Sequence, residues 1–318
     1  MKLLIVESLE FSPDALAQLH GRFDVVAADL DRPALLRSVH DADVLWVRLR
    51  HAIDREVMDA APRLAVIVTN TTGTNHIDLE EAARRGIRVL SLRGETDFLR
   101  NVRATAELAV GLLLALVRHI PAAAAHVRAG GWDRYQFKGH QIFGKTAGII
   151  GYGRLGRLMG GYLAAFGLRV LATTKPDDEV TPDAGVTMTS LETLLAESDI
   201  VSLHVDLRRE TAGLIGRDAF RAMKPGAWFI NTARGELVDE SALVEALERG
   251  HLGGAAIDVV ADPLHNAIAG RALHDYAARH DNLIITPHIG GYTFESLAAT
   301  EIFLAGKLID LVSAARQD

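Results

Sequence analysis

Short apolar runs of strand length alternate with segments of helical pattern, and this alternation restricts the possible folds more than any other feature of the chain. The first four runs are LLIV at 3–6, VLWV at 44–47, LAVIV at 64–68 and RVL at 88–90. The later runs are AGII at 147–150, RVLA at 169–172, IVSL at 200–203, WFIN at 228–231, AAID at 255–258 and LIIT at 283–286. Strands separated by helices predict parallel sheets, and strands that are apolar without alternation indicate helices on both faces. The sequence therefore predicts an α/β fold.

The length of the chain indicates two domains, because a single hydrophobic core stops growing at fewer than 318 residues. We predict two doubly wound parallel-sheet domains with an intervening cleft. Residues 1–98 and 292–318 form the first domain, and residues 99–291 form the second. The helical segment from Ala104 to His119 is apolar nearly all round, so it must be buried on several sides. A second subunit would bury part of it, and we therefore expect a homodimer.

The composition argues against several classes of function. A formal net charge of −7 disfavours nucleic acid or an anionic membrane as the partner. The absence of cysteine excludes disulfides, a thiolate nucleophile and a cysteine-ligated metal. The N-terminal run LLIV is too short for a signal-peptide core or a membrane span. We expect a cytoplasmic protein that acts on a small molecule without a bound metal.

A glycine pattern follows the run at 147–150 and opens the next helical segment. Gly151 permits a tight turn, Gly153 lets a pyrophosphate approach the backbone, and Gly156 lets the helix pack closely on the strand. The N-terminus of the helix would stabilise the negative charge of that ligand. A glycine-rich turn in an unrelated fold is the alternative, but the strand-like runs before and after the pattern favour a dinucleotide site.

The end of the next strand-like run bears on the choice between NAD and NADP. An acid that binds the ribose hydroxyls of NAD is expected about 20 residues after the glycines. Thr174 stands at that place and Lys175 follows, which favours the 2′-phosphate of NADP. The alternative is that Asp177 or Asp178 folds back and serves as the missing acid. We predict a modest preference for NADP(H), with NAD(H) still usable.

Three further motifs occur in order: NTARG at 231–235, AIDVVADP at 256–263 and TPHIGG at 286–291. With the glycine pattern they resemble the D-isomer-specific 2-hydroxyacid dehydrogenase family over almost the whole chain, including phosphoglycerate dehydrogenases and 2-oxo acid reductases. The resemblance implies a flavodoxin-like substrate domain, a Rossmann domain, and an NAD(P)-dependent oxidoreductase that transfers a hydride between the cofactor and a D-2-hydroxy acid or 2-oxo acid. The implied catalytic residues are Arg234, Asp262 and His288. The implied cofactor contacts are Arg154, Leu155, His204, Thr232, Ala233 and Asp258.

The chemistry of 2-oxo acid reduction suits these residue types. Arg234 can bind a carboxylate as a planar fork and polarise the adjacent carbonyl group. A histidine ordinarily titrates near neutral pH, so His288 can donate the proton in reduction and accept it in oxidation. Asp262, if it is hydrogen-bonded to that imidazole, would raise the pKa of His288 and orient the ring. Each has a structural alternative: His288 as an ordinary core or surface residue, Arg234 as a helix-capping cation, and Asp262 as the cap of a turn before Pro263. The family usually has a glutamate one residue later than Asp262.

Candidate substrate contacts lie in the first domain. Thr72, Gly73 and Thr74 follow the run at 64–68 and can offer backbone N–H groups to a carboxylate. The segment GTNHIDL resembles the corresponding loop of bacterial phosphoglycerate dehydrogenases, and Arg48 and Arg50 resemble arginines that those enzymes place near an anionic substrate. We therefore expect a substrate with a second anionic group. Ordinary solvated surface charge is the alternative for both arginines.

Two other functions are compatible with the motifs. A formate- or phosphite-type dehydrogenase is disfavoured, because such substrates have no extended carbon chain. A cofactor-sensing interaction protein would resemble the corepressors of the same family and would carry partner-binding surfaces or tails. Oxidation of NADH or NADPH in the presence of 2-oxo acids distinguishes an enzyme from an interaction protein.

Overall fold

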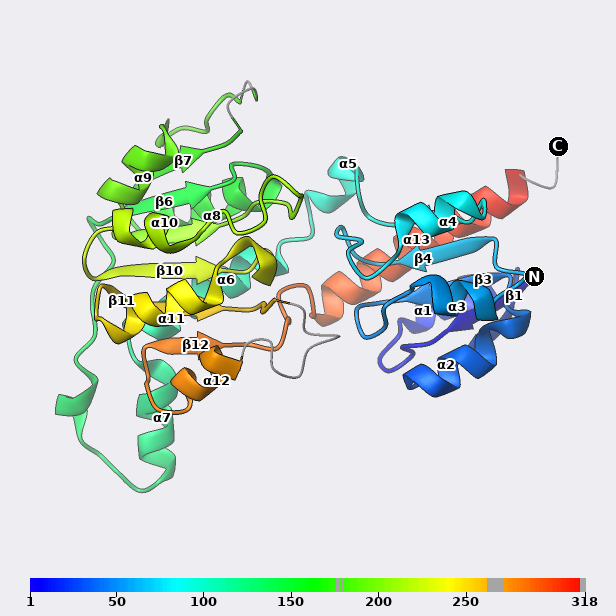
Figure 1. Cartoon of the computed structure of the whole chain (residues 1–318), viewed down its shortest axis with the longest axis horizontal. Helices are drawn as coiled ribbons and strands as arrows, with labels where there is room; N and C mark the ends of the chain where they lie inside the picture. Colours follow the sequence, from blue (N-terminus) through cyan, green and yellow to red (C-terminus); the bar gives the residue numbers. More distant parts are fainter. Residues whose placement is uncertain (176–177, 179, 262–270, 315–318) are drawn as a thin grey trace. The chain divides into compact units, whose positions relative to one another are not determined.

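The computed structural model describes residues 1–175, 178, 180–261 and 271–314. The chain divides into two compact units, of which unit 1 comprises Met1–Val102 with Tyr292–Asp318 and unit 2 comprises Arg103–Gly291. The sequence alone places the first crossing after residue 98, and the contacts place it after Val102. Each unit contains one wholly parallel sheet with helices, so the predicted α/β class is confirmed (Figure 1).

Unit 1 contains a five-stranded sheet with the order β2-β1-β3-β4-β5. Its strands are β1 Lys2–Ile5, β2 Asp24–Ala27, β3 Val44–Val47, β4 Val66–Thr69 and β5 Arg88–Leu90. Its helices are α1 Pro13–His20, α2 Arg32–Ser38, the 3-10 turn η1 Val39–Asp41, α3 Arg55–Ala60, α4 Leu79–Arg84, α5 Thr96–Leu99 and α13 Phe294–Ala314. Helix α13 packs against α1, so unit 1 is formed by two segments that are far apart in the sequence.

Alternate residues of the central strands of unit 1 face two separate cores. In β3, Leu45 and Val47 pack with side chains of α2, α3 and α4, whereas Val44 and Trp46 pack with side chains of α1 and α13. This division follows from the two-residue period of a strand. Helices therefore cover both faces of the sheet, which explains why β3 and β4 are apolar without alternation.

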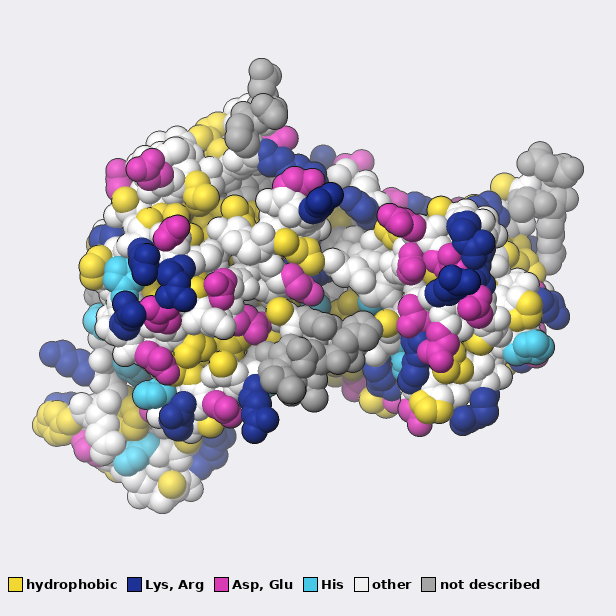
Figure 2. All heavy atoms as spheres, in the orientation of Figure 1, with side chains coloured by type: hydrophobic (Ala, Val, Ile, Leu, Met, Phe, Trp, Pro, Cys, Tyr) yellow, Lys and Arg dark blue, Asp and Glu magenta, His cyan; other side chains and the backbone are white. Residues whose placement is uncertain are grey.

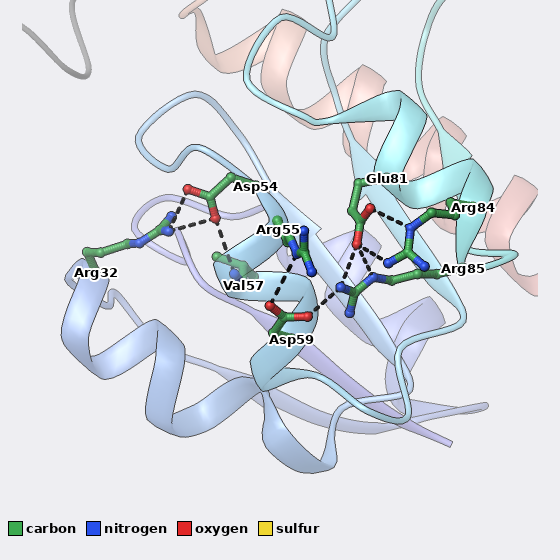
Figure 3. Close-up of polar contacts among 8 residues, drawn as sticks. All are labelled: Arg32, Asp54, Arg55, Val57, Asp59, Glu81, Arg84 and Arg85. Atoms are coloured by element: carbon green, nitrogen blue, oxygen red, sulfur yellow. Dashed lines mark hydrogen bonds and ion pairs between the residues drawn. The ribbon is translucent and has the colours of Figure 1, made fainter.

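Two groups of ion pairs join the helices on one face of unit 1 (Figure 3). Arg32 of α2 pairs with Asp54, the residue that caps the N-terminus of α3, at 2.7 Å. Asp59 of α3 pairs with Arg85, which also pairs with Glu81 of α4. Hydrogen bonds from Arg84 and Arg85 lower the pKa of the Glu81 carboxyl group to about 2. Acidic and basic side chains are intermingled over the visible surface of both units (Figure 2).

Unit 2 contains a seven-stranded sheet with the order β12-β11-β10-β9-β6-β7-β8. Its strands are β6 Thr146–Ile150, β7 Arg169–Thr173, β8 Val186–Met188, β9 Ile200–Leu203, β10 Ala227–Asn231, β11 Leu252–Ile257 and β12 Leu283–Ile285. Its helices are α6 Ala104–Val117, α7 Ile120–Arg128, η2 Arg134–Phe137, α8 Arg154–Ala165, α9 Leu191–Glu197, α10 Arg217–Ala222, η3 Gly235–Leu237, α11 Glu240–Glu248 and α12 Arg271–Ala277. The strand order reverses at β6, which pairs with β7 on one side and β9 on the other. In open parallel sheets, ligands bind beside the carboxyl ends of the strands at such a reversal.

Helix α6 is largely buried inside its own unit, where it contacts α8, β10 and β11. This packing accounts for the apolar composition of α6 without a second subunit. Among the described residues, no single helix combines the length and the apolar composition that crossing a membrane requires. The segments Thr96–Val117 and Ile120–Arg128 meet that requirement only as a pair, and they are bent by 65° at the break between them.

Candidate functional site

The three glycines after β6 differ in what surrounds them. Gly151 has a φ of +93°, and a Cβ atom there would lie 2.5 Å from the carbonyl oxygen of His204. A Cβ atom on Gly156 would lie 2.1 Å from the carbonyl oxygen of Gly151, so only glycine permits this close approach of α8 to the turn. Gly153 is different, because a Cβ atom there would meet no atom within 4 Å. The exposed backbone of Gly153, at the N-terminus of α8, therefore has room for a ligand.

An acidic side chain, that of Asp178, contacts the residue that follows β7. The Thr174 hydroxyl donates a hydrogen bond to Asp178 Oδ2 at 3.2 Å, and the Asp178 N–H donates to the carbonyl oxygen of Lys175. The Lys175 side chain is exposed. Asp177 lies outside the described residues. The end of β7 thus presents both a cation, Lys175, and a carboxylate, Asp178. The cation favours the 2′-phosphate of NADP, and the carboxylate favours the ribose hydroxyls of NAD.

Two buried polar atoms lie after the neighbouring strands. His204, after β9, shares a 2.9 Å hydrogen bond between its Nε2 and the Ser202 hydroxyl, and burial lowers its pKa to about 4. Within the described part of the chain, His204 Nδ1 has no hydrogen-bond partner, and neither has the hydroxyl of Thr232 after β10. A buried polar atom without a partner is costly. Both atoms are therefore suited to contact a ligand.

Arg234 lies in a loop that the surrounding backbone holds tightly. The Asn231 side chain donates to the carbonyl oxygen of Arg234 at 2.9 Å and accepts from the N–H of Ala233 at 2.9 Å. A Cβ atom on Gly235 would lie 2.0 Å from the carbonyl carbon of Val260, so the loop passes directly against the segment after β11. Among the described residues, no carboxylate forms an ion pair with Arg234. Its guanidinium, which donates to the Ala233 carbonyl oxygen at 2.6 Å, retains further donors.

Asp258 organises the loop that carries His288. Its Oδ1 accepts hydrogen bonds from the Thr286 hydroxyl at 2.5 Å and the Ile289 N–H at 2.9 Å, and its Oδ2 accepts from the Gly290 N–H at 2.7 Å. Its carbonyl oxygen accepts from the His288 N–H at 2.9 Å. His288 itself has a φ of +57°, a conformation that is uncommon outside glycine. The 1% exposed Asp258 therefore holds His288 in an otherwise unfavourable backbone conformation.

The charges around His288 connect it with Arg234. Burial lowers the pKa of His288, and the positive charge of Arg234 lowers it further, whereas Asp258 and Glu236 act in the opposite direction. Burial also lowers the pKa of Arg234, while Glu236 and Asp206 raise it. Glu236 was missed by the sequence interpretation, although its position two residues after Arg234 could have drawn attention to it. Asp262, the third predicted catalytic residue, lies outside the described residues.

In unit 1 the two predicted substrate arginines have different surroundings. Arg48 forms a buried ion pair with Glu301 of α13, at 2.5 Å from Nη2 to Oε1, and its Nη1 donates to the carbonyl oxygen of Leu9. Glu301 is 0% exposed and also accepts from the Ser12 N–H. The Arg50 side chain is about half exposed and pairs with Asp29 at 2.9 Å. Only Arg50 therefore extends to the surface.

The predicted loop of Thr72, Gly73 and Thr74 follows the carboxyl end of β4, as expected. Within the part of the chain that the structure describes, the backbone N–H groups of these three residues donate to no acceptor. Three neighbouring free N–H groups are suited to binding an anion. No group of three or more acidic or histidine side chains among the described residues is arranged to hold a metal ion.

Comparison with known proteins identifies the family. Residues 110–290 match the family model described as D-isomer specific 2-hydroxyacid dehydrogenase, NAD binding domain. The D-3-phosphoglycerate dehydrogenase of Mycobacterium bovis is 38% identical over 92% of this chain, which spans only 53% of that relative. The glyoxylate reductase of Thermococcus litoralis is 38% identical over 87% of this chain and 83% of its own length. A crystal structure of D-lactate dehydrogenase from Aquifex aeolicus, complexed with NAD and lactic acid, superposes with a TM-score of 0.84 at 28% identity and covers 100% of this chain and 97% of that one. The chain therefore belongs to the D-isomer specific 2-hydroxyacid dehydrogenase family.

Proposed function

We propose that the protein is a nicotinamide-dependent oxidoreductase that interconverts a 2-oxo acid and a D-2-hydroxy acid. The observation that carries this proposal is that the charge of Arg234 acts on the buried imidazole of His288. The two side chains lie in loops after β10 and β12, the strands on either side of β11, and Asp258, directly after β11, helps to position His288. A cation for the carboxylate beside a group that exchanges a proton is the arrangement that this reaction needs.

The residues after β6, β7, β9 and β10 fit a nicotinamide dinucleotide. The space beside Gly153 and the N-terminus of α8 suit the pyrophosphate, with Arg154 and Leu155 in the first turn of that helix. The unpartnered atoms of His204 and Thr232 suit the nicotinamide half, next to Ala233. The bound cofactor would supply the hydride. Both carboxylate oxygens of Asp258 already accept bonds from the 286–290 loop, so we assign it chiefly to positioning His288.

Each residue then has a definite task in reduction. One 2-oxo acid, one reduced cofactor and one proton give one 2-hydroxy acid and one oxidised cofactor. Arg234 binds the substrate carboxylate and draws electron density from the carbonyl oxygen, while the His288 imidazolium donates the proton to that oxygen. In oxidation the neutral imidazole takes the proton back. We propose, from the family resemblance, that Asp262 orients this imidazole.

The substrate is proposed to carry a carboxylate and a further anionic group. Unit 1 supports this with the free N–H groups of residues 72–74 and the exposed Arg50, whereas Arg48 is committed to Glu301. Oxidation of NADH and NADPH should be measured with glyoxylate, pyruvate and phosphohydroxypyruvate, the oxo acids that correspond to the substrates named for the relatives. Cofactor binding without turnover of any of them would favour the interaction-protein alternative.

For cofactor choice we propose a modest preference for NADPH, with NADH still used. Lys175 attracts the 2′-phosphate, and Asp178, which accepts a hydrogen bond from Thr174, opposes it. Thr174→Asp should reverse the preference, because a second carboxylate repels the phosphate and accepts bonds from the ribose hydroxyls. The ratio of kcat/KM for the two cofactors should change by about tenfold or more, since one charged contact is worth about 1.5–3 kcal/mol. Thr187→Asp on β8 is the matched control, and a wild-type preference of tenfold for NADH would contradict the proposal.

Glu236 is predicted to set the pH range of reduction. Its negative charge raises the pKa of His288, so Glu236→Gln should lower that pKa further below the ordinary value for histidine. Reduction needs the imidazolium form, which is lost as the pH rises through the His288 pKa. The alkaline limb of kcat/KM for reduction should therefore move to lower pH, and oxidation should begin at lower pH. Glu248→Gln, on the surface of α11, should leave both profiles unchanged, and an unchanged profile in Glu236→Gln would contradict this role.

We propose that the protein is a homodimer formed through the arm that comprises α7 and residues 129–143. The arm projects from the body of unit 2 (Figure 1). Three of its aromatic side chains are largely exposed, at 90% for Trp132, 81% for Tyr135 and 69% for Phe143. Exposed aromatic side chains are enriched in interfaces between proteins. A second copy of the chain would cover them.

Light scattering at micromolar concentration is expected to give twice the chain mass of 34.4 kDa. The double variant Trp132→Ser, Tyr135→Ser should give the single-chain mass with an unchanged circular dichroism spectrum. A wild-type mass of 34.4 kDa would contradict the dimer. A double variant that is still dimeric would show that the interface does not depend on these two side chains.

A further inference from the structure

The loop after β4 is held by a row of side-chain hydrogen bonds that ends at a buried histidine. Thr69, the last residue of β4, is 0% exposed, and His76 is 7% exposed. We propose that Thr69 and His76 are positioning residues that orient the N–H groups of residues 72–74 toward the carboxylate of the substrate. This inference rests on the proposed function and extends it to two residues that touch neither substrate nor cofactor.

The number of hydroxyl hydrogens determines the direction of every bond in the row. The Thr71 hydroxyl donates its one hydrogen to the carbonyl oxygen of Gly73 at 2.6 Å. In the 3.0 Å contact between the two threonine hydroxyls, Thr71 must therefore accept and Thr69 must donate. Thr69 then has no hydrogen left for the 3.2 Å contact with His76, so His76 Nε2 carries a hydrogen and donates it. The row is thus directed from His76 through Thr69 and Thr71 to Gly73.

Because the peptide group is planar, the row of hydrogen bonds also determines the direction in which the N–H donors point. In a trans peptide the C=O of one residue and the N–H of the next point in opposite directions. Fixing the Gly73 carbonyl to the Thr71 hydroxyl therefore fixes the Thr74 N–H on the opposite side. The Thr71 carbonyl is fixed in the same way by the N–H of Leu92 at 3.0 Å, which orients the N–H of Thr72. Two donors are thereby held in place before any ligand binds.

The end of the loop at His76 is attached to the segment before α3. The carbonyl oxygen of His76 accepts from the N–H of Ile53, and that of Ile53 accepts from the N–H of Asp78 at 2.9 Å. His76 is therefore fixed by its backbone as well as by its burial. Preorganised donors bind an anion more tightly than mobile ones, because less conformational freedom is lost on binding. Breaking the row at Thr69 should weaken carboxylate binding and leave the rest of the protein intact.

The test compares Thr69→Val, which removes the hydroxyl at nearly constant volume, with Thr69→Ser, which keeps it. Oxalate, a dicarboxylate without a reacting carbonyl group, is titrated into each protein without cofactor, and the amide signals of Thr72, Gly73 and Thr74 are followed by NMR. Thr69→Val should weaken oxalate binding about fivefold to tenfold, the effect of losing one neutral hydrogen bond, and should raise KM for the 2-oxo acid by a similar factor. The kcat value and NADH affinity should remain unchanged, and Thr69→Ser should behave as wild type.

The outcomes separate this inference from the proposed function. Equal oxalate affinity in wild type and Thr69→Val overturns the positioning role, and so does a wild-type enzyme whose 72–74 amide signals do not respond to oxalate. A further outcome is that the amide signals respond to oxalate in wild type, with weaker oxalate binding in Thr69→Val, although no 2-oxo acid is turned over. In that case the positioning role of Thr69 stands and the proposed reaction fails. The 15N shifts of His76 provide a separate check, because the row requires a hydrogen on Nε2.

Discussion

Replacement of His288 by alanine is expected to lower kcat for reduction by roughly 10²–10⁴-fold, the usual contribution of a general acid. The role rests on a buried imidazole whose pKa the Arg234 charge lowers and whose loop Asp258 holds. The affinity for NADH should change little, because the glycine turn and α8 are untouched. Steady-state kinetics with the best 2-oxo acid and fluorescence titration of NADH measure the two effects.

His20→Ala, at the exposed end of α1, is the matched control and should retain full turnover. A kcat in His288→Ala within a factor of three of wild type would remove His288 from the chemistry. A parallel loss of NADH affinity would show instead that the substitution disturbs the cofactor site.

Replacement of Arg48 by methionine is expected to lower the free energy of unfolding of unit 1 by about 3–5 kcal/mol, because it leaves the Glu301 carboxylate buried without its cation. Burial already raises the pKa of Glu301 in the intact protein. A group whose pKa is higher in the folded state than in the unfolded state favours folding below its unfolded pKa, and this contribution is lost as the pH rises. The variant should therefore be much less destabilised at about pH 4 than at pH 7.

Urea unfolding of wild type, Arg48→Met and the double variant Arg48→Met, Glu301→Leu tests the pair. The double variant should recover most of the lost stability, because apolar side chains of similar volume can replace a buried ion pair. Arg63→Met, which removes the more exposed pair with Asp43, should cost about 1 kcal/mol or less. If the double variant is no more stable than Arg48→Met, the cost does not come from an unpaired buried charge.

The sequence predicts the strands of this fold where burial on both faces leaves an uninterrupted apolar run. β3, β4, β9 and β10 are wholly buried and all were expected. The two strands that were missed, β2 and β8, are edge strands with exposed residues. Both strands are short, DVVA and VTM, and Val186 is the only one of their residues that is buried, so neither forms an uninterrupted buried run.

The functional residues show a corresponding limit. Motifs predicted the glycine turn, Arg234 and His288 as site residues, because each occupies a fixed distance from a strand end. They did not indicate that Arg48 forms an ion pair with Glu301, because the two residues are separated by 253 positions in the sequence. Nor did they reveal Glu236 or the row from His76 to Gly73, because these roles depend on side-chain contacts that spacing does not specify.

The distance along the chain between Arg48 and Glu301 also has a consequence for synthesis on the ribosome. At about 5–20 residues per second, roughly 10–50 s pass between the addition of the two residues. All of unit 2 emerges in that interval as one continuous segment, whereas unit 1 still lacks α13, which contributes to the core on one face of its sheet. The nascent N-terminal segment therefore lacks the part of the core around Val44 and Trp46 that α13 contributes until that helix emerges. Chaperones that bind apolar strands should associate with this part of the chain during translation and leave it once α13 has been released.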